Sequence, residues 1–207
     1  MAARIHAEGL RLVFSRRTIF SGISFSVSGS GVVLIAGRNG SGKSTLVKIV
    51  CGVLTPTAGS ARIESDDARD QFSRKALIGM VAPYLQLYEE FSAMENLRMS
   101  MRLRGYRSAD ELSRGLLDRV ALDANRKDPV RGFSSGMKQR LKYAMALVHR
   151  PSILVLDEPM SNLDADGTAI VRSIMEEQRT AGILVVATND LSDIDGWDTE
   201  VNLNAAR

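Results

Sequence analysis

Residues 37–45 read Gly-Arg-Asn-Gly-Ser-Gly-Lys-Ser-Thr, and they decide the fold. Their spacing, G-x-x-x-x-G-K-S, predicts a loop whose backbone N–H groups wrap around phosphate oxygens. An apolar run of the buried-strand type, 32–36, precedes the loop, and residues 46–50 follow it with the apolar spacing of a helix. We therefore expect a strand, a phosphate loop and a helix in that order. The phosphates would lie at the helix N-terminus, where unpaired N–H groups and the helix dipole favour negative charge.

The residue types inside this loop point to a nucleoside triphosphate. Glycine lets the backbone turn tightly and approach the phosphates closely. Lys43 is expected to reach the β- and γ-phosphates, and the hydroxyl of Ser44 to hold Mg²⁺. A glycine-rich turn with a chance Lys-Ser pair is the alternative, and the flanking strand and helix argue against it. The residues expected to contact the nucleotide are Gly37, Asn39, Gly40, Ser41, Gly42, Lys43, Ser44 and Thr45.

An acidic pair supplies the second part of such a site. Asp157 and Glu158 follow directly after 153–156, a short apolar run typical of a buried strand. In α/β sheets, ligands bind at the carboxyl ends of the parallel strands. We expect Asp157 to bind Mg²⁺, directly or through water, and Glu158 to act as the general base that polarises the attacking water. An exposed Asp-Glu turn is the alternative, and the phosphate loop upstream argues against it.

The composition limits the class of protein. The 207 residues suit one α/β domain, 1–207, with a sizeable core. The net charge is only +3, without a basic patch and interleaved aromatics, so we expect no nucleic-acid partner. Cys51 is the only cysteine, which excludes a disulfide within the chain and predicts a buried structural thiol. Neither a signal peptide nor a membrane span is recognisable, so we expect a soluble, cytoplasmic chain that contacts a membrane only through a partner.

The pattern along the chain alternates between strand-like and helix-like segments. Short β-type runs fill the first forty residues, whereas 92–130 is helical in character, with capping boxes predicted at Ser92 and Ser108 and core methionines behind them. This alternation predicts a mainly parallel core sheet with helices on both sides and a helical insertion in the middle. A turn is expected at 55–59, strands at 60–64, 153–156 and 183–187, and helices at 135–149 and 165–181.

A further segment, 133–140, reads Phe-Ser-Ser-Gly-Met-Lys-Gln-Arg and resembles the signature motif of ATP-binding cassette (ABC) ATPases. The usual form of that motif is Leu-Ser-Gly-Gly-Gln, of which Ser134 and Gly136 are kept. Other landmarks follow the family order: residues ending at Asp164 resemble its D-loop, and Phe14 stands where an aromatic ring stacks on adenine. The likeness covers nearly the whole chain.

This resemblance implies a fold class and a nucleotide. The fold would be the ABC type of P-loop NTPase, an α/β structure with a mainly parallel core sheet and an N-terminal antiparallel β subdomain. A helical subdomain, about 88–150, would be inserted in the RecA-like core. ATP with Mg²⁺ would be the cofactor, and Phe14, Ser134, Gly136 and Asp164 would join the phosphate loop in binding it.

The signature segment also implies a partner. Ser134 lies where a helix N-cap would, and with the Gly136 N–H and the helix dipole it would form a second anion site. In the family this site closes on the γ-phosphate held by another copy's phosphate loop. One loop and one signature therefore resemble half of a working unit, and imply a head-to-tail dimer, expected to be a homodimer.

The family resemblance further implies transport. We expect the ATPase subunit of an ABC membrane transporter with an export bias, peripheral on the cytoplasmic face of the inner or cell membrane and bound to a separate transmembrane permease. The chain length and the stretch 17–25 resemble the haem-exporter ATPase of cytochrome c maturation, which suggests haem as cargo. Two alternatives stay open: a soluble cassette ATPase acting on the ribosome or on DNA, and a regulatory cassette that binds ATP but hydrolyses it weakly.

Two positions depart from the family pattern. Asn189 replaces the His that usually stands between Thr and Asp in the family. The asparagine amide donates a hydrogen bond but cannot take up and release a proton as imidazole does, so we expect slow or partner-dependent ATP turnover. Pro83 occupies the position of the Gln in the family's Q-loop. Gln86, three residues on, is the candidate replacement as a metal contact, with a simply exposed side chain as the alternative.

Overall fold

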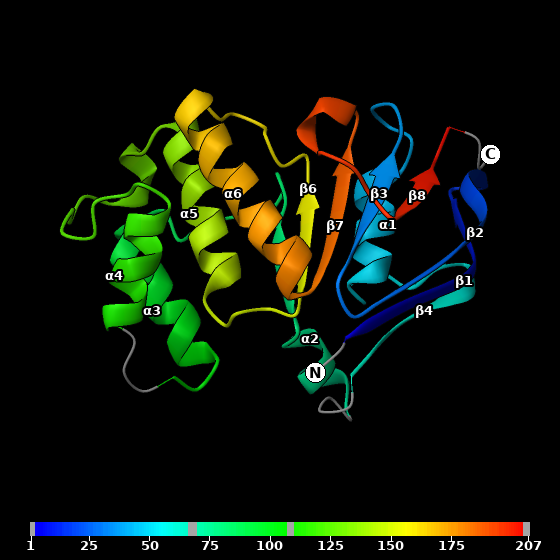
Figure 1. The fold of residues 1–207 in the computed structure, drawn as a ribbon, viewed down its shortest axis with the longest axis horizontal. Coiled ribbons are helices and arrows are strands. Elements are labelled where there is room, and N and C mark those ends of the chain that lie inside the picture. The colour runs from blue at the N-terminus through cyan, green and yellow to red at the C-terminus, as the bar shows by residue number, and fades with distance from the viewer. Residues whose placement is uncertain (1–2, 66–69, 107–109, 205–207) are drawn as a thin grey trace.

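The computed structural model describes residues 3–65, 70–106 and 110–204, and it contains two sheets. A five-stranded parallel sheet has the order β5-β6-β7-β3-β8, and a three-stranded antiparallel sheet has the order β2-β1-β4 (Figure 1). The strands are β1 Arg4–Phe14, β2 Arg17–Ser28, β3 Gly31–Ala36, β4 Ala58–Glu64, β5 Ile78–Val81, β6 Ile153–Asp157, β7 Ile183–Thr188 and β8 Thr199–Asn202. The helices are α1 Lys43–Val50, α2 Gln71–Lys75, α3 Ala93–Leu103, α4 Asp110–Arg119, α5 Ser135–Leu147 and α6 Ala165–Ala181, with short 3-10 turns η1 Val130–Gly132 and η2 Leu191–Asp193.

The parallel sheet is covered on both faces, as its sequence predicts. Every residue of β3, β6 and β7 is buried, because helices or strands pack on either side. Alternate residues point to opposite faces: Leu34 and Leu154 belong to the core under α5 and α6, whereas Val33 and Val155 belong to the core under α1 and the antiparallel sheet. The expected α/β class, with helices on both sides of a mainly parallel sheet, is confirmed.

The N-terminal strands form the antiparallel sheet. β1 and β2 alternate between buried and exposed side chains, since one face packs on the core and the other meets solvent. One boundary in the sequence prediction was wrong: residues 58 and 59 belong to β4, not to a turn. Pairing with β1 extends this strand, with Arg11 opposite Ala58.

The helices α3, α4 and α5 lie together at one end of the parallel sheet (Figure 1). The capping box at Ser92 is confirmed, since its hydroxyl accepts from the Glu95 N–H while the Glu95 carboxylate accepts from the Ser92 N–H. The one predicted at Ser108 lies outside the described residues. Met94 and Met101 are buried core residues, as predicted. Among the described residues no helix combines the length and apolar character needed to cross a lipid bilayer.

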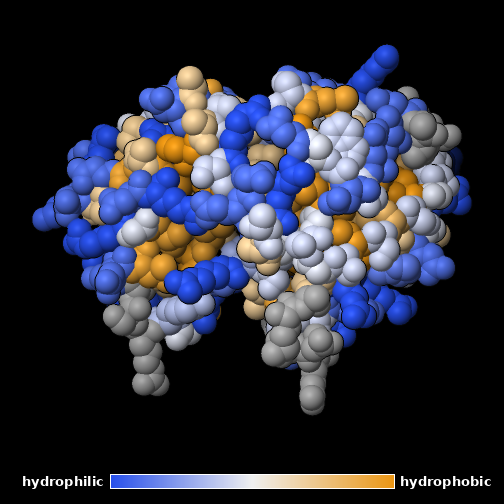
Figure 2. Space-filling view, in the orientation of Figure 1, coloured by the Kyte–Doolittle hydropathy of each residue, from blue (hydrophilic) through white to orange (hydrophobic). Residues whose placement is uncertain are grey.

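Three of the strands and α-helices, α2, β5 and β8, were missed by the sequence analysis, and β5 has only four residues. α2 has only five residues, too few for a periodic pattern. β8 reads Thr-Glu-Val-Asn and buries only Val201, because it is an edge strand that pairs with β3 on one side. Figure 2 shows hydrophobic surface over α3 to α5, interrupted by hydrophilic residues.

The strand direction positions the site. Because β3, β6 and β7 are parallel neighbours, their carboxyl ends meet at one edge of the sheet, the upper edge in Figure 1. The N-termini of α1, α5 and α6 lie toward the same edge.

Candidate nucleotide-binding site

The phosphate loop joins β3 to α1 as a tight turn. Gly42 caps α1 with φ +104°, a conformation that side-chain-bearing residues rarely adopt, and a Cβ there would come within 2.6 Å of Ile19. A Cβ on Gly37 would approach the Ser41 hydroxyl to 2.5 Å. Glycine is therefore required at Gly42, a side chain at Gly37 would displace the Ser41 hydroxyl, and the predicted loop and helix are present.

Lys43 lies inside its own loop. Its ammonium donates to the Gly37 carbonyl at 2.8 Å and lies 3.2 Å from Glu158 Oε1, and the side chain is only 5% exposed. These contacts hold the positive charge at the centre of the loop, where phosphate oxygens would compete for it.

Asp157 is a buried carboxylate without a partner. It ends β6 with no exposed surface, and neither carboxylate oxygen has a hydrogen-bond partner within normal distance among the described residues. Burial raises the pKa of Asp157, while the nearby Ser44 hydroxyl and the charges of Lys43 and Lys48 oppose the rise. A buried carboxylate in this state indicates a missing partner.

The residues present fit Mg²⁺. This ion prefers oxygen ligands and in phosphate sites takes one or two from the protein and the rest from phosphates and water. Asp157 and the Ser44 hydroxyl offer that set at the start of α1. No cluster of three or more His, Cys, Asp or Glu side chains occurs within the described ranges, so these residues hold no all-protein metal cage.

Glu158 faces a different environment from its neighbour. Its backbone adopts φ +51°, at a cost of about 1–2 kcal/mol for a residue other than glycine, and its N–H donates to Ala187 O at 2.8 Å. The turn leaves Asp157 fully buried and the Glu158 side chain 28% exposed. Glu158 therefore reaches both Lys43 and solvent, the arrangement that a general base acting on water requires.

Asn189 emerges at the same edge. It follows β7, which pairs with β6 so that Asp157 lies opposite Ala187. Its side chain is exposed and has no hydrogen bond to any described residue. The sheet thus brings the phosphate loop, Asp157, Glu158 and Asn189 to one edge, as the sequence analysis expected.

The signature residues lie elsewhere on this edge. Ser134 is the N-cap of α5 and accepts from the Met137 N–H at 3.2 Å, as predicted. Gly136 packs near the Asn162 carbonyl, which a Cβ would approach to 3.0 Å. Figure 1 shows the start of α5 set well to one side of the phosphate loop, with α6 and β7 between them. Both signature residues are therefore separated from the loop of their own chain.

The remaining candidates have mixed surroundings. Asp164 caps α6 by accepting from the Gly167 N–H at 2.8 Å. Phe14 ends β1 and is 72% exposed, which leaves its ring free to stack. Gln86 is exposed and contacts no described side chain by hydrogen bond. Instead Tyr84, which the sequence analysis passed over, lies against α1, its ring centroid 4.1 Å from Lys48 Nζ.

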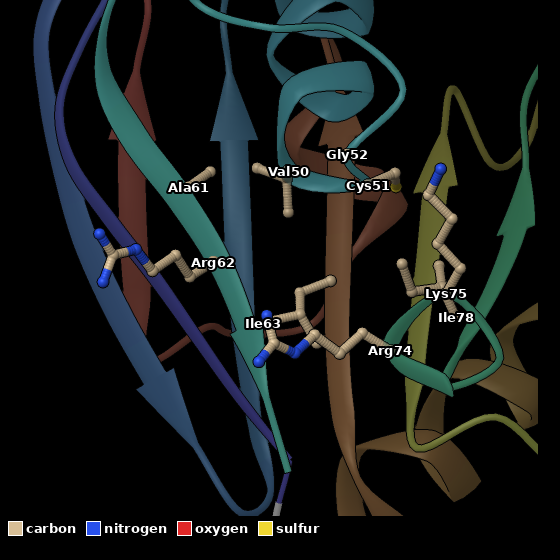
Figure 3. A pocket seen from close by; sticks show the side chains of 9 residues that line it. All are labelled: Val50, Cys51, Gly52, Ala61, Arg62, Ile63, Arg74, Lys75 and Ile78. Carbon is tan, nitrogen blue, oxygen red and sulfur yellow. The ribbon is translucent and has the colours of Figure 1, made fainter. Parts of the chain in front are cut away.

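A cavity lies away from the phosphate loop. It measures about 290 Å³ and opens beside the end of α1, between β4 and α2 (Figure 3). Lys75 extends along one side of it toward Cys51 and Arg74 extends toward Ile63, whereas the Arg62 side chain points away from it. Burial raises the pKa of the Cys51 thiol to about 12, so the thiol stays protonated and unreactive at neutral pH. The burial predicted for Cys51 is confirmed.

The fold and the site define a P-loop nucleoside triphosphatase, with a glycine-rich loop after one buried strand and an acidic pair after another. A model of the ABC transporter family matches residues 20–161. The chain belongs to the ABC transporter family and is an ATP-binding ATPase.

Similar proteins and solved structures agree with this family assignment. The chain is 33% identical to the lantibiotic transport ATP-binding protein SrtF of Streptococcus pyogenes, over 91% of this chain and 81% of SrtF. It is 33% identical to the cytochrome c biogenesis ATP-binding export protein CcmA of Methylococcus capsulatus, over 98% of this chain and 99% of CcmA. Among solved structures, the ATP-binding subunit of an ABC transporter superposes with a TM-score of 0.78 at 25% identity, over 91% of this chain and 80% of that one. A bacterial Atm1-family ABC exporter with ATP bound shares the fold, with a TM-score of 0.81 at 24% identity, over 98% of this chain and 37% of that one.

Proposed function

We propose that this chain hydrolyses ATP to drive an ABC transporter of the export type. One observation supports ATP hydrolysis most directly. The Asp157 carboxylate is buried without a hydrogen-bond partner near Ser44 and near Lys43, whose ammonium is held inside the phosphate loop. The phosphates would occupy the loop 37–45, and adenine would stack on the exposed ring of Phe14. Ser44 and Asp157 would hold Mg²⁺, which when bound supplies positive charge beside the β- and γ-phosphates.

The contact between Lys43 and Glu158 suggests how hydrolysis begins. In the structure, the Glu158 carboxylate lies 3.2 Å from the Lys43 ammonium. Phosphate oxygens compete for that ammonium, because charge-assisted bonds to phosphate are strong. Glu158 would then be released to accept a proton from a water molecule in line with the γ-phosphate, and the exposed Asn189 amide would help to orient that water.

A second copy of the chain completes the site in this proposal. Ser134 and Gly136 lie at the same edge as the phosphate loop but apart from it, so they would serve the nucleotide of a partner arranged head to tail. Their helix N-terminus offers unpaired N–H groups to the γ-phosphate. ATP would then join two copies, and its hydrolysis would release them.

The names of the relatives support a proposal for the partner and the cargo. CcmA matches this chain over almost its whole length and is named as an export protein of cytochrome c biogenesis. We propose a transmembrane permease as partner, with this chain at the cytoplasmic face of the membrane, and haem as cargo. SrtF, equally similar, is named for lantibiotic transport, so the permease would decide the cargo.

Fractionation of the native host tests this proposal. A tagged copy should remain with the membranes through a high-salt wash and leave them in detergent together with a polytopic membrane protein. Identifying that protein and testing haem retention in the complex would check the cargo. A chain found wholly in the cytosol, or travelling with ribosomes or DNA, would overturn the transporter proposal and favour a soluble cassette.

Asn189 favours a second possibility, a cassette that hydrolyses weakly. An asparagine amide is shorter than imidazole and relays no proton, so we expect Asn189→His to raise the ATPase rate several-fold, up to about the 10²-fold at the low end of acid–base contributions. Steady-state ATPase assays of the purified variant would measure this. Asn189→Gln, which lengthens the amide without adding a titratable ring, is the matched control. Equal or lower turnover in Asn189→His would show that Asn189 does not limit the rate.

A further inference from the structure

Lys48 lies one helical turn after Ser44 on α1, so both side chains project from the same face of the helix. Its ammonium stands 4.1 Å from the centre of the Tyr84 ring. It also lies near enough to Asp157 for its charge to oppose the raised pKa of that carboxyl. Among the described residues, no carboxylate lies within ion-pair distance of the Lys48 ammonium.

The Asp157 carboxylate is buried and forms no ion pair, although the charge of Lys48 lies within range of it. Asp157 has no exposed surface and no hydrogen-bond partner among the residues described. The flexible four-carbon stem of a lysine lets its ammonium change position. An opposite charge nearby favours the ionised form of a buried carboxylate. An ion pair with Lys48 would lower the free-energy cost of keeping the buried Asp157 carboxylate ionised. It would also occupy the carboxylate oxygens that a metal ion needs.

The position of Tyr84 accounts for the absence of that ion pair. An ammonium over an aromatic face is attracted by the partially negative π-face of the neutral ring. Tyr84 is 38% exposed, partial burial raises the pKa of its hydroxyl, and the charge of Asp157, which lies within range of that hydroxyl, adds to the rise. The backbone that leads to Tyr84 is held as well. Lys142 of α5 donates to the carbonyls of Ala82 and Pro83, each at 3.2 Å.

We propose that Tyr84 is a positioning residue, whose ring holds the Lys48 ammonium beside Asp157 without an ion pair and so keeps the Asp157 carboxylate open to Mg²⁺. This inference rests on the proposed function, in which Asp157 and Ser44 take the metal. It assigns to Tyr84 and Lys48 a part in setting the Mg²⁺ requirement for nucleotide binding. It assigns no such part to Gln86.

The test is the Mg²⁺ midpoint for binding a fluorescent ADP analogue to the purified chain. In Tyr84→Leu the ring is lost and Lys48 is free to pair with Asp157, so the midpoint should rise about three- to tenfold, the range of one partly buried cation–π contact. Tyr84→Phe keeps the ring and should retain the wild-type midpoint. Removing the lysine as well, in Tyr84→Leu/Lys48→Met, should return the midpoint toward wild type, a rescue that a general loss of structure could not produce.

The outcomes separate this proposal from the one on which it rests. If wild-type binding of the analogue did not depend on Mg²⁺, the assignment of Asp157 and Ser44 would fail. If wild type required Mg²⁺ but Tyr84→Leu had the same midpoint, only the role of Tyr84 would be overturned. A raised midpoint that persisted in the double variant would likewise overturn it, because Lys48 would not be the competitor.

Discussion

Glu158→Gln is expected to lower the ATP turnover by about 10²- to 10⁴-fold, the usual contribution of a positioned general base. The amide keeps the size of the side chain but cannot accept a proton from water. It also removes the negative charge that lies 3.2 Å from Lys43, so ATP binding should be retained or strengthened. Because ATP would bind without being hydrolysed, the variant should accumulate as an ATP-dependent dimer.

Steady-state turnover and size-exclusion chromatography with ATP measure both effects. Glu176→Gln is the matched control, because Glu176 lies on the surface of α6 in an i,i+3 pair with Arg179 and should leave turnover unchanged. A variant that turned over at the wild-type rate would remove Glu158 from catalysis. Negligible turnover in wild type and variant alike would favour the regulatory cassette.

Ser134→Asp is expected to lower turnover by about 10²- to 10³-fold, the usual cost of disturbing one contact that stabilises transferring charge. Aspartate caps a helix as well as serine does, so the N-terminus of α5 should stay folded. The added negative charge would instead repel the γ-phosphate of the partner's ATP. Ser134→Asn, an equally good but neutral cap, is the matched control and should lose much less activity.

A mixture with a second inactive variant tests the head-to-tail arrangement. Lys43→Met should also be inactive, because the charge at the centre of the phosphate loop is lost. A dimer of one Ser134→Asp chain and one Lys43→Met chain contains one intact composite site, whereas either variant alone contains none. An equal mixture should regain about a quarter of wild-type turnover if copies exchange freely and the sites act independently. No recovery on mixing, with exchange shown by differently labelled copies, would argue that each chain completes its own site.

The parts of the site that could be predicted are those built from neighbouring residues. The phosphate loop depends on contacts within a few positions, such as Lys43 to Gly37, and glycine at Gly42 is required by the local φ angle. The N-cap at Ser134 is likewise local. Such features follow from residue type and spacing, so the sequence reveals them directly.

Edges and short elements could not be predicted in the same way. The polar β8 is a strand because β3 offers it an edge, and β4 begins two residues early because β1 pairs with it. Their own residues carry a weak pattern, since strand formation depends on the partner as much as on the propensity of the segment.

The sequence by itself determined the α/β class, the phosphate loop and the acidic strand end, because the loop and the strand end are short motifs with local causes. Only the tertiary structure decided which of these residues meet. The strand order β5-β6-β7-β3-β8 brings Glu158 within 3.2 Å of Lys43. The packing buries Asp157 without a hydrogen-bond partner and places the Lys48 ammonium over the Tyr84 ring. It also sets Ser134 apart from the phosphate loop of its own chain. These relations join segments far apart in the sequence, and they arise from how the sheet and helices pack rather than from any one motif.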